Sequence, residues 1–206
     1  MTTTPDPTTG TPSGAGVIRA HFLASAAVKQ QAAEALAGPA ADAAARMTTA
    51  LREGHKILIC GNGGSAADAQ HFAGEMVGRF KLPNRPALPA LALTTDSTVL
   101  TCVANDFCYE DVFGRQVEAF AQPGDVLVGI STSGRSENVL RAVQAARARG
   151  ATAIVLVGAS GGPIAEAADL ALSMPSTEAA RIQECHITVI HAICELIENA
   201  LAAPAC

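Results

Sequence analysis

The sequence predicts an α/β protein, in which a parallel sheet of five strands lies between two layers of helices, with further helices added at the N-terminus. Beyond Gly54, apolar runs of about five residues alternate with helical stretches, which is typical of parallel sheets covered on both faces. Right-handed connections between such strands place helices on both sides and give a three-layer α/β/α sandwich. With 206 residues, the chain has room for one such domain.

The N-terminal part precedes this alternation. Residues 1–16 are rich in Thr, Pro and Gly, and we expect them to form a disordered tail. Residues 17–53 are rich in Ala and predict two helices, because Gly38–Pro39 interrupts the helical pattern. The α/β core and the C-terminal helix follow over residues 54–203, so that residues 17–203 form a single domain.

The expected strands are short apolar runs, namely Lys56–Cys60, Leu88–Thr94, Asp125–Ile130, Thr152–Val157 and Leu170–Met174. Helical stretches separate them, and a long helix is predicted over residues 178–201. Ligands of such sheets bind beyond the carboxyl ends of the strands. We therefore expect the functional site in the loops that follow Cys60, Thr95 and Ile130.

Composition narrows the classes of function. The net charge of −5 and the aromatic content of 3% disfavour a nucleic-acid-binding protein, which needs a basic face and stacking rings. The sequence shows neither a secretory leader nor a membrane-spanning run, so we expect a cytoplasmic protein with no membrane partner. Only 16% of the residues are charged, which favours an oligomer with apolar subunit contacts. The cysteines form no C-x-x-C pair and are expected to be buried, reduced thiols.

A glycine-rich loop follows the first strand and consists of Gly61, Asn62, Gly63, Gly64 and Ser65. It leads into a helix expected to begin at about Ala66, so backbone N–H groups and the helix N-terminus favour an anion there. The loop also fits the G-x-G-x-x-A dinucleotide pattern, but the nearest acidic candidate, Asp96, lies about 30 residues further on instead of about 20. Nucleotide binding is therefore the weaker alternative.

A hydroxyl-rich loop follows the third strand and contains Ser131, Thr132, Ser133 and Ser136. A helix cap would explain Ser136, and an ordinary turn would explain one more of these residues. Four hydroxyls at the end of a buried strand are better explained by a phosphate group. Because the loop contains no lysine, it favours a sugar phosphate held by neutral donors.

Two predicted helices carry candidate catalytic or metal-ligating residues. His71 and Glu75 are four residues apart and share a helix face. Gln183 and His191, eight residues apart, lie on roughly one side of the last helix. Spacing alone leaves a surface ion pair and a core histidine open as explanations. By spacing alone, His186 and the His191/Glu195 pair fit a functional role equally well.

Four segments resemble those of phosphoheptose isomerases, which are enzymes with a sugar-isomerase (SIS) domain: residues 61–75 (GNGGSAADAQHFAGE), 103–107 (VANDF), 129–139 (GISTSGRSENV) and 181–198 (RIQECHITVIHAICELIE). The resemblance covers most of residues 17–201. It implies a flavodoxin-like strand order and a homotetramer with active sites at subunit interfaces. It also implies an isomerase that interconverts sedoheptulose 7-phosphate and D-glycero-D-heptopyranose 7-phosphate.

The resemblance further implies roles for individual residues. Glu75 falls at the position of the catalytic base, and His191 falls at that of its acid/base partner. One zinc ion per subunit would be held by His71, Glu75, Gln183 and His191. Substrate contacts would come from Asn62, Gly63, Gly64, Ser65, Glu75, Asn105, Asp106, Ser131, Thr132, Ser133, Ser136 and Gln183.

Other proteins with this domain are not enzymes. One relative binds a replication initiator, and other members sense sugar phosphates. The resemblance implies that the initiator-binding relative lacks the carboxylate of Glu75 and the imidazole of His191, both of which this chain has. The enzyme is therefore the favoured interpretation, and a non-catalytic SIS-domain protein is the alternative.

Overall fold

The structure is a computed structural model and describes residues 13–202. Its five strands form one parallel sheet in the order β2-β1-β3-β4-β5, which confirms the predicted flavodoxin-like sheet. The strands are β1 (Ile57–Gly61), β2 (Ala90–Ala92), β3 (Val126–Ser131), β4 (Thr152–Val157) and β5 (Leu170–Ser173). Each lies within about two residues of a predicted run, which is the usual uncertainty of predicted boundaries.

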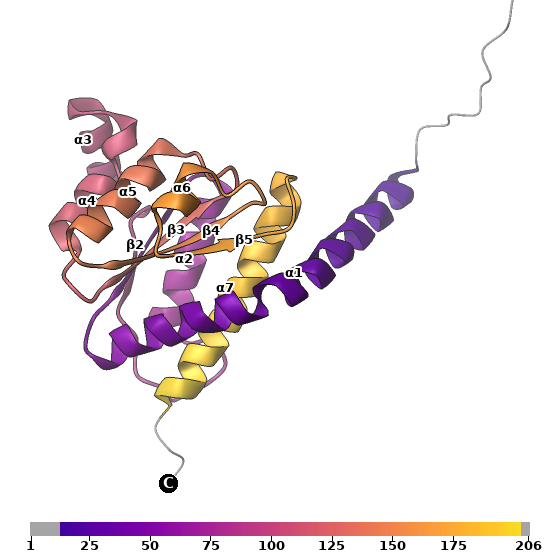
Figure 1. Ribbon diagram of the computed structural model, residues 1–206, viewed down its shortest axis with the longest axis horizontal. Helices are drawn as coiled ribbons and strands as arrows, with labels where there is room; N and C mark the ends of the chain where they lie inside the picture. Colours follow the sequence, from indigo (N-terminus) through magenta and orange to yellow (C-terminus); the bar gives the residue numbers. More distant parts are fainter. Residues whose placement is uncertain (1–12, 203–206) are drawn as a thin grey trace, which may run out of the picture.

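Helices cover both faces of this sheet (Figure 1). One layer consists of α1 (Gly14–Arg52), α2 (Gly64–Val77) and α7 (Ala179–Leu201). The other consists of α3 (Ser97–Asp106), the 3₁₀ turn η1 (Tyr109–Asp111), α4 (Gly114–Phe120), α5 (Glu137–Ala148) and α6 (Gly162–Ala167). Successive strand residues face opposite layers, so Ile57 and Ile59 belong to the first core while Leu58 and Cys60 belong to the second.

The N-terminal region differs from the prediction. A single helix, α1, replaces the two helices expected on either side of Gly38–Pro39, and Pro39 lies inside it. Proline removes one backbone donor. Its neighbours Leu36 and Ala40 are buried in the core shared with α7, and this packing outweighs the local preference for a break.

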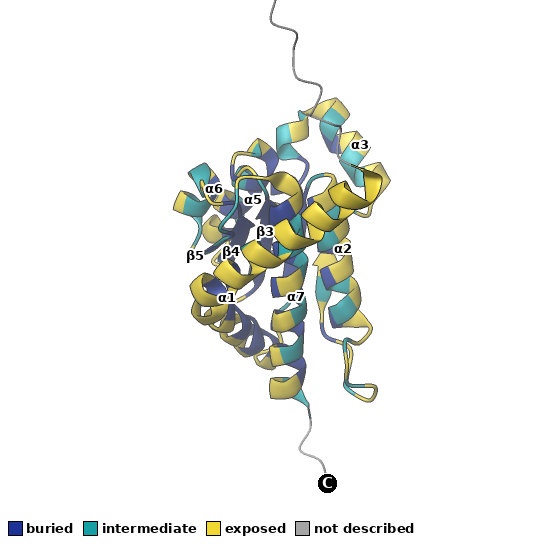
Figure 2. Cartoon of the chain, turned by 90° about the vertical axis from the view of Figure 1, so that its right-hand side faces the viewer, coloured by how far each residue is buried: buried dark blue, intermediate teal, exposed yellow. Residues whose placement is uncertain are grey.

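The predicted disordered tail is also partly wrong. Gly14–Gly16 form the first turn of α1, where the Ser13 hydroxyl accepts a hydrogen bond from the Gly16 N–H at 3.1 Å. Residues 1–12 lie outside the described part of the chain. The N-terminal half of α1 extends beyond the sheet, and Figure 2 shows it as almost wholly exposed.

Cysteine burial follows the prediction only in part. The five cysteines within residues 13–202 are free thiols, and Cys60, Cys185 and Cys194 are buried. Cys102, on α3, is exposed, and Cys108 is partly exposed. None of the helices in this part of the chain has the length and apolarity that crossing a membrane requires.

Candidate active site

The glycine-rich and hydroxyl-rich loops lie side by side. They follow β1 and β3, which are neighbours in the sheet and form its topological switch point. Asn62, in the glycine-rich loop, and Asn138, in the first turn of α5, form two reciprocal amide hydrogen bonds of 2.8 and 2.9 Å. The Tyr109 hydroxyl also donates to Asn62 Oδ1 at 3.1 Å. Sequence reasoning missed Asn138 and Tyr109, although Tyr109 is the only tyrosine in the chain.

The serines of the hydroxyl-rich loop face one another. Ser131 Oγ lies 3.0 Å from Ser136 Oγ and 3.5 Å from Ser133 Oγ. Ser136 occupies the N-cap position of α5, but its hydroxyl makes no capping hydrogen bond. A cap therefore does not explain this side chain. The three hydroxyls converge where the backbone N–H groups of a helix N-terminus also favour an anion.

Close packing fixes the shape of both loops. Gly134 has a φ of +66°, and a Cβ there would collide with the carbonyl of Gly161. A Cβ on Gly61 would lie 2.8 Å from the carbonyl oxygen of Ser65, which is itself buried in the first turn of α2. Glycine is therefore required at these positions on steric grounds.

A cluster of three possible metal ligands lies between α2 and α7. His71 Nε2 is 3.0 Å from Glu75 Oε1 and 3.3 Å from His191 Nε2, and the three ligand atoms lie within 4.8 Å of one another. Two nitrogens bound to a tetrahedral zinc ion at 2.0–2.1 Å are separated by about 3.3 Å. The spacing and the His/Glu/His donor set therefore fit a divalent metal. The side chain of His71 is 45% exposed, so this site is open to a substrate.

Gln183 lies apart from this cluster. Its amide packs against Gly64, where any added Cβ would collide with it. An α-helix rises about 1.5 Å per residue, so the eight residues between Gln183 and His191 span about 12 Å of α7. Within one chain, the structure brings together three of the four predicted ligands and places Gln183 at the glycine-rich loop.

Asn105 and Asp106 end α3 and are exposed. The Asn105 amide donates to Asp106 Oδ1 at 2.8 Å. The structure shows no hydrogen bond from either side chain to the two loops within the described residues. Their segment is nevertheless tied to the glycine-rich loop, because Tyr109 follows three residues later and bonds Asn62.

Burial also shifts the pKa values of two other residues on α2 and α7, Asp68 and His186. Asp68 lies one turn before His71, and its Oδ2 is buried without a hydrogen-bond partner. Burial raises the pKa of this carboxyl, and the neighbouring His71 opposes that shift. His186 is fully buried, and burial lowers its pKa to about 4. His186 is therefore a core histidine and lies outside the candidate site.

The fold and the paired loops are those of a SIS domain. The sequence model of the SIS domain family matches residues 21–158. This match covers well over half of the chain, so the protein is a SIS-domain protein.

Known proteins narrow the assignment further. A phosphoheptose isomerase from Aquifex aeolicus is 52% identical over 182 residues, covering 88% of this chain and 95% of that protein. The structure of a phosphoheptose isomerase from Neisseria gonorrhoeae has a TM-score of 0.84 and 48% identity, over 89% of this chain and 97% of that one. The structure of a phosphoheptose isomerase from Francisella tularensis has a TM-score of 0.86 and 39% identity, also over 89% of this chain and 97% of that one. The chain belongs to the phosphoheptose isomerase family, and its activity is that of an isomerase.

Proposed function

We propose that this protein interconverts sedoheptulose 7-phosphate and D-glycero-D-heptopyranose 7-phosphate. The observation that carries the proposal is the cluster of His71, Glu75 and His191, which forms where α2, the helix that follows the glycine-rich loop, packs against α7. An acid/base pair and a phosphate site are the two things that a sugar-phosphate isomerase needs. The high identity to phosphoheptose isomerases along most of the chain supports this substrate class.

The phosphate would be held at the hydroxyl-rich loop. Ser131, Ser133 and Ser136 present three converging hydroxyls, and Thr132 lies between them in the chain. The glycine-rich loop would line the sugar with Asn62, Gly63, Gly64 and Ser65, and the Gln183 amide lies against that same loop. Asn105 and Asp106 would close over the substrate through the Tyr109 link.

Glu75 would act as the base. Moving the carbonyl between the first two carbons requires removal of a carbon-bound proton, followed by proton transfers among the oxygens of a cis-enediol. The Glu75 side chain is 21% exposed, so it is partly shielded from water yet reachable by a substrate. His191, with its Nε2 directed at His71, would donate and accept the oxygen-bound protons.

His71, Glu75 and His191 would hold one zinc ion per subunit. When bound, such an ion supplies polarisation of the substrate carbonyl and of the developing enediolate. Within a single chain, Gln183 lies at the glycine-rich loop and not at this cluster. We therefore assign Gln183 to the substrate rather than to the metal of its own subunit.

The protein would work as a homotetramer in the cytoplasm. The extended half of α1 exposes four large apolar side chains, with 44% of Val17, 60% of Ile18, 74% of Phe22 and 60% of Leu23 accessible. Copies of the chain would cover this surface and bring active sites to the subunit interfaces.

Incubation with sedoheptulose 7-phosphate tests the proposed reaction. NMR spectroscopy should show the anomeric signals of an aldose product, and solvent deuterium should enter at the carbon that exchanges its proton. A folded protein that leaves the ketose unchanged under these conditions would refute the activity. Capture of a large protein partner by such an inactive chain would favour the non-catalytic alternative.

A further inference from the structure

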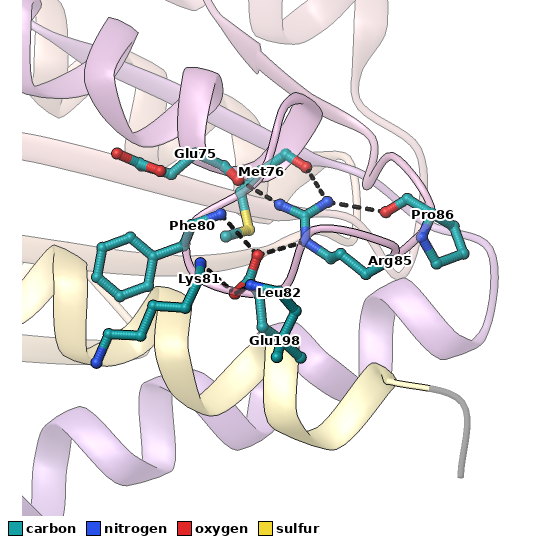
Figure 3. A network of polar contacts seen from close by, with 8 residues as sticks. All are labelled: Glu75, Met76, Phe80, Lys81, Leu82, Arg85, Pro86 and Glu198. Carbon is teal, nitrogen blue, oxygen red and sulfur yellow. Dashed lines mark hydrogen bonds and ion pairs between the residues drawn. The ribbon is translucent and has the colours of Figure 1, made fainter. Parts of the chain in front are cut away.

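The segment between α2 and β2, residues 78–89, contains no regular helix or strand, yet it is firmly anchored. Its anchor is Glu198, near the end of α7 (Figure 3). One carboxylate oxygen of Glu198 accepts the backbone N–H of Phe80 at 2.6 Å, and the other accepts those of Lys81 and Leu82 at 2.7 and 3.0 Å. Three consecutive N–H groups thus converge on one side chain.

Arg85, from the same segment, completes the anchor. Its Nε donates to Glu198 Oε1 at 2.7 Å, and its Nη atoms donate to the backbone carbonyls of Glu75, Met76 and Pro86. Both charged side chains are only 1% exposed. Burial alone would raise the pKa of Glu198, but these hydrogen bonds outweigh it and lower the pKa to about 2. The Glu198 carboxyl is therefore ionised at neutral pH.

This anchor reaches the candidate site at two points. Arg85 binds the carbonyl of Glu75 and so fixes the last turn of α2, which carries that carboxylate. Glu198 fixes the backbone of Phe80, whose ring stacks on the imidazole of His191 with 5.3 Å between ring centroids and 21° between planes. His71 approaches the same imidazole edge-on, with a centroid distance of 5.1 Å.

A buried ion pair is a poor source of stability, because desolvation of two charges offsets much of their attraction. A connection between a helix and a strand can be held by apolar contacts instead. Charged hydrogen bonds are directional, so they fix the position of each carboxylate oxygen and of each N–H group that binds it. Here the fixed groups are those that set the positions of Glu75 and His191.

We propose that Arg85, Glu198 and Phe80 are positioning residues that hold the His71–Glu75–His191 cluster in its metal-binding geometry. Phe80 acts through His191 by restricting rotation of the imidazole, and the ion pair acts by holding Phe80 and the last turn of α2. The inference deepens the proposed function, because it concerns the same metal site.

Phe80→Leu is the decisive variant, because it removes the flat ring and leaves the ion pair and the backbone intact. Phe120→Leu is the control, because it makes the same change at an exposed phenylalanine at the end of α4, on the other face of the sheet. Phe80→Tyr keeps the ring and should behave like the wild-type protein. The measurement is the zinc dissociation constant of the metal-free protein, obtained by competition with a chromophoric chelator.

We expect Phe80→Leu to weaken zinc binding roughly 10- to 100-fold, as loss of outer-shell support does at other metal sites. Phe120→Leu and Phe80→Tyr should change it less than about twofold, and thermal unfolding of metal-free Phe80→Leu should stay close to that of Phe120→Leu. Glu198→Gln should weaken zinc binding at least as much as Phe80→Leu where it folds.

Unchanged zinc affinity in Phe80→Leu would overturn the inference, and so would a wild-type protein that takes up no zinc. Loss of affinity that merely follows a loss of folded protein would also overturn it and leave a structural role. Failure of the proposed function looks different. In that case sedoheptulose 7-phosphate would stay unchanged, while zinc affinity still depended on the Phe80 ring.

Discussion

Replacement of Ser131 by alanine should weaken substrate binding while leaving the chemical step nearly intact. Ser131 ends β3, is 4% exposed, and places its hydroxyl 3.0 Å from that of Ser136. The change removes one donor to the proposed phosphate without opening the loop. A hydrogen bond to a charged group contributes about 1.5–3 kcal/mol. At about 1.4 kcal/mol per factor of ten, KM should rise roughly 10- to 150-fold.

The phosphate is remote from the reacting carbons. Loss of a hydrogen bond to it should therefore weaken binding of the substrate and of the transition state equally. KM should therefore rise while kcat changes little. Initial rates with sedoheptulose 7-phosphate give both constants, and Ser131→Ala combined with Ser133→Ala should raise KM further. Ser173→Ala is the control, because Ser173 ends the edge strand β5 and lies in neither loop.

An unchanged KM in the double variant would refute this assignment and would move the phosphate to the Gly63–Gly64 turn. A fall in kcat without a change in KM would refute the reasoning differently, because it would place these hydroxyls at the reacting carbons. Ser173→Ala should match the wild-type enzyme in both constants. A similar rise of KM in that control would show that the effect is unspecific.

Three further predictions concern the cluster and the core. Glu75→Gln should lower kcat roughly 100- to 10,000-fold with sugar binding retained, and full turnover in the folded variant would contradict its role as the base. Elemental analysis should find about one zinc ion per subunit, and His191→Asn should lose it; full activity after chelation would make the ion accessory. His186 binds a proton more readily when unfolded, because burial lowers its folded pKa to about 4. Stability should therefore fall as the pH drops from about 6.5 toward 4, by roughly 2 kcal/mol at pH 5. Urea unfolding of His186→Gln should show less of that fall.

The core of the fold was predictable because its signal is local. The buried strands are short apolar runs, and in β3 all six residues are buried. The order of strands did not follow from those runs and came from the family resemblance. The break expected at Gly38–Pro39 was wrong because α7 packs along α1, and sequence preference at one proline says nothing about a partner more than a hundred residues away.

The candidate site was predictable where one element carries the signal. His71 and Glu75 share a face of α2, and the serines share one loop, so spacing made both groups candidates, and the family resemblance supplied the roles of His71 and Glu75. The residues that spacing missed make contacts between elements that are far apart in the sequence. Phe80 meets His191 from a loop, and Glu198 gathers N–H groups that lie more than a hundred positions earlier. No local pattern marks such contacts, because they exist only after α2 and α7 have packed together.

Glu75 carries two demands that conflict in the proposed mechanism. A carboxylate held by a divalent ion is a weaker base, yet the proposed base must accept a proton from the substrate carbon. In the proposed mechanism Glu75 would divide these roles between its two oxygens, because Oε1 lies 3.0 Å from His71 Nε2 and the second oxygen would accept the proton. That separation requires a carboxylate that does not rotate freely. The 3.0 Å contact with His71 Nε2 restrains the carboxylate itself, and Arg85 restrains the backbone of the last turn of α2 by binding the Glu75 carbonyl.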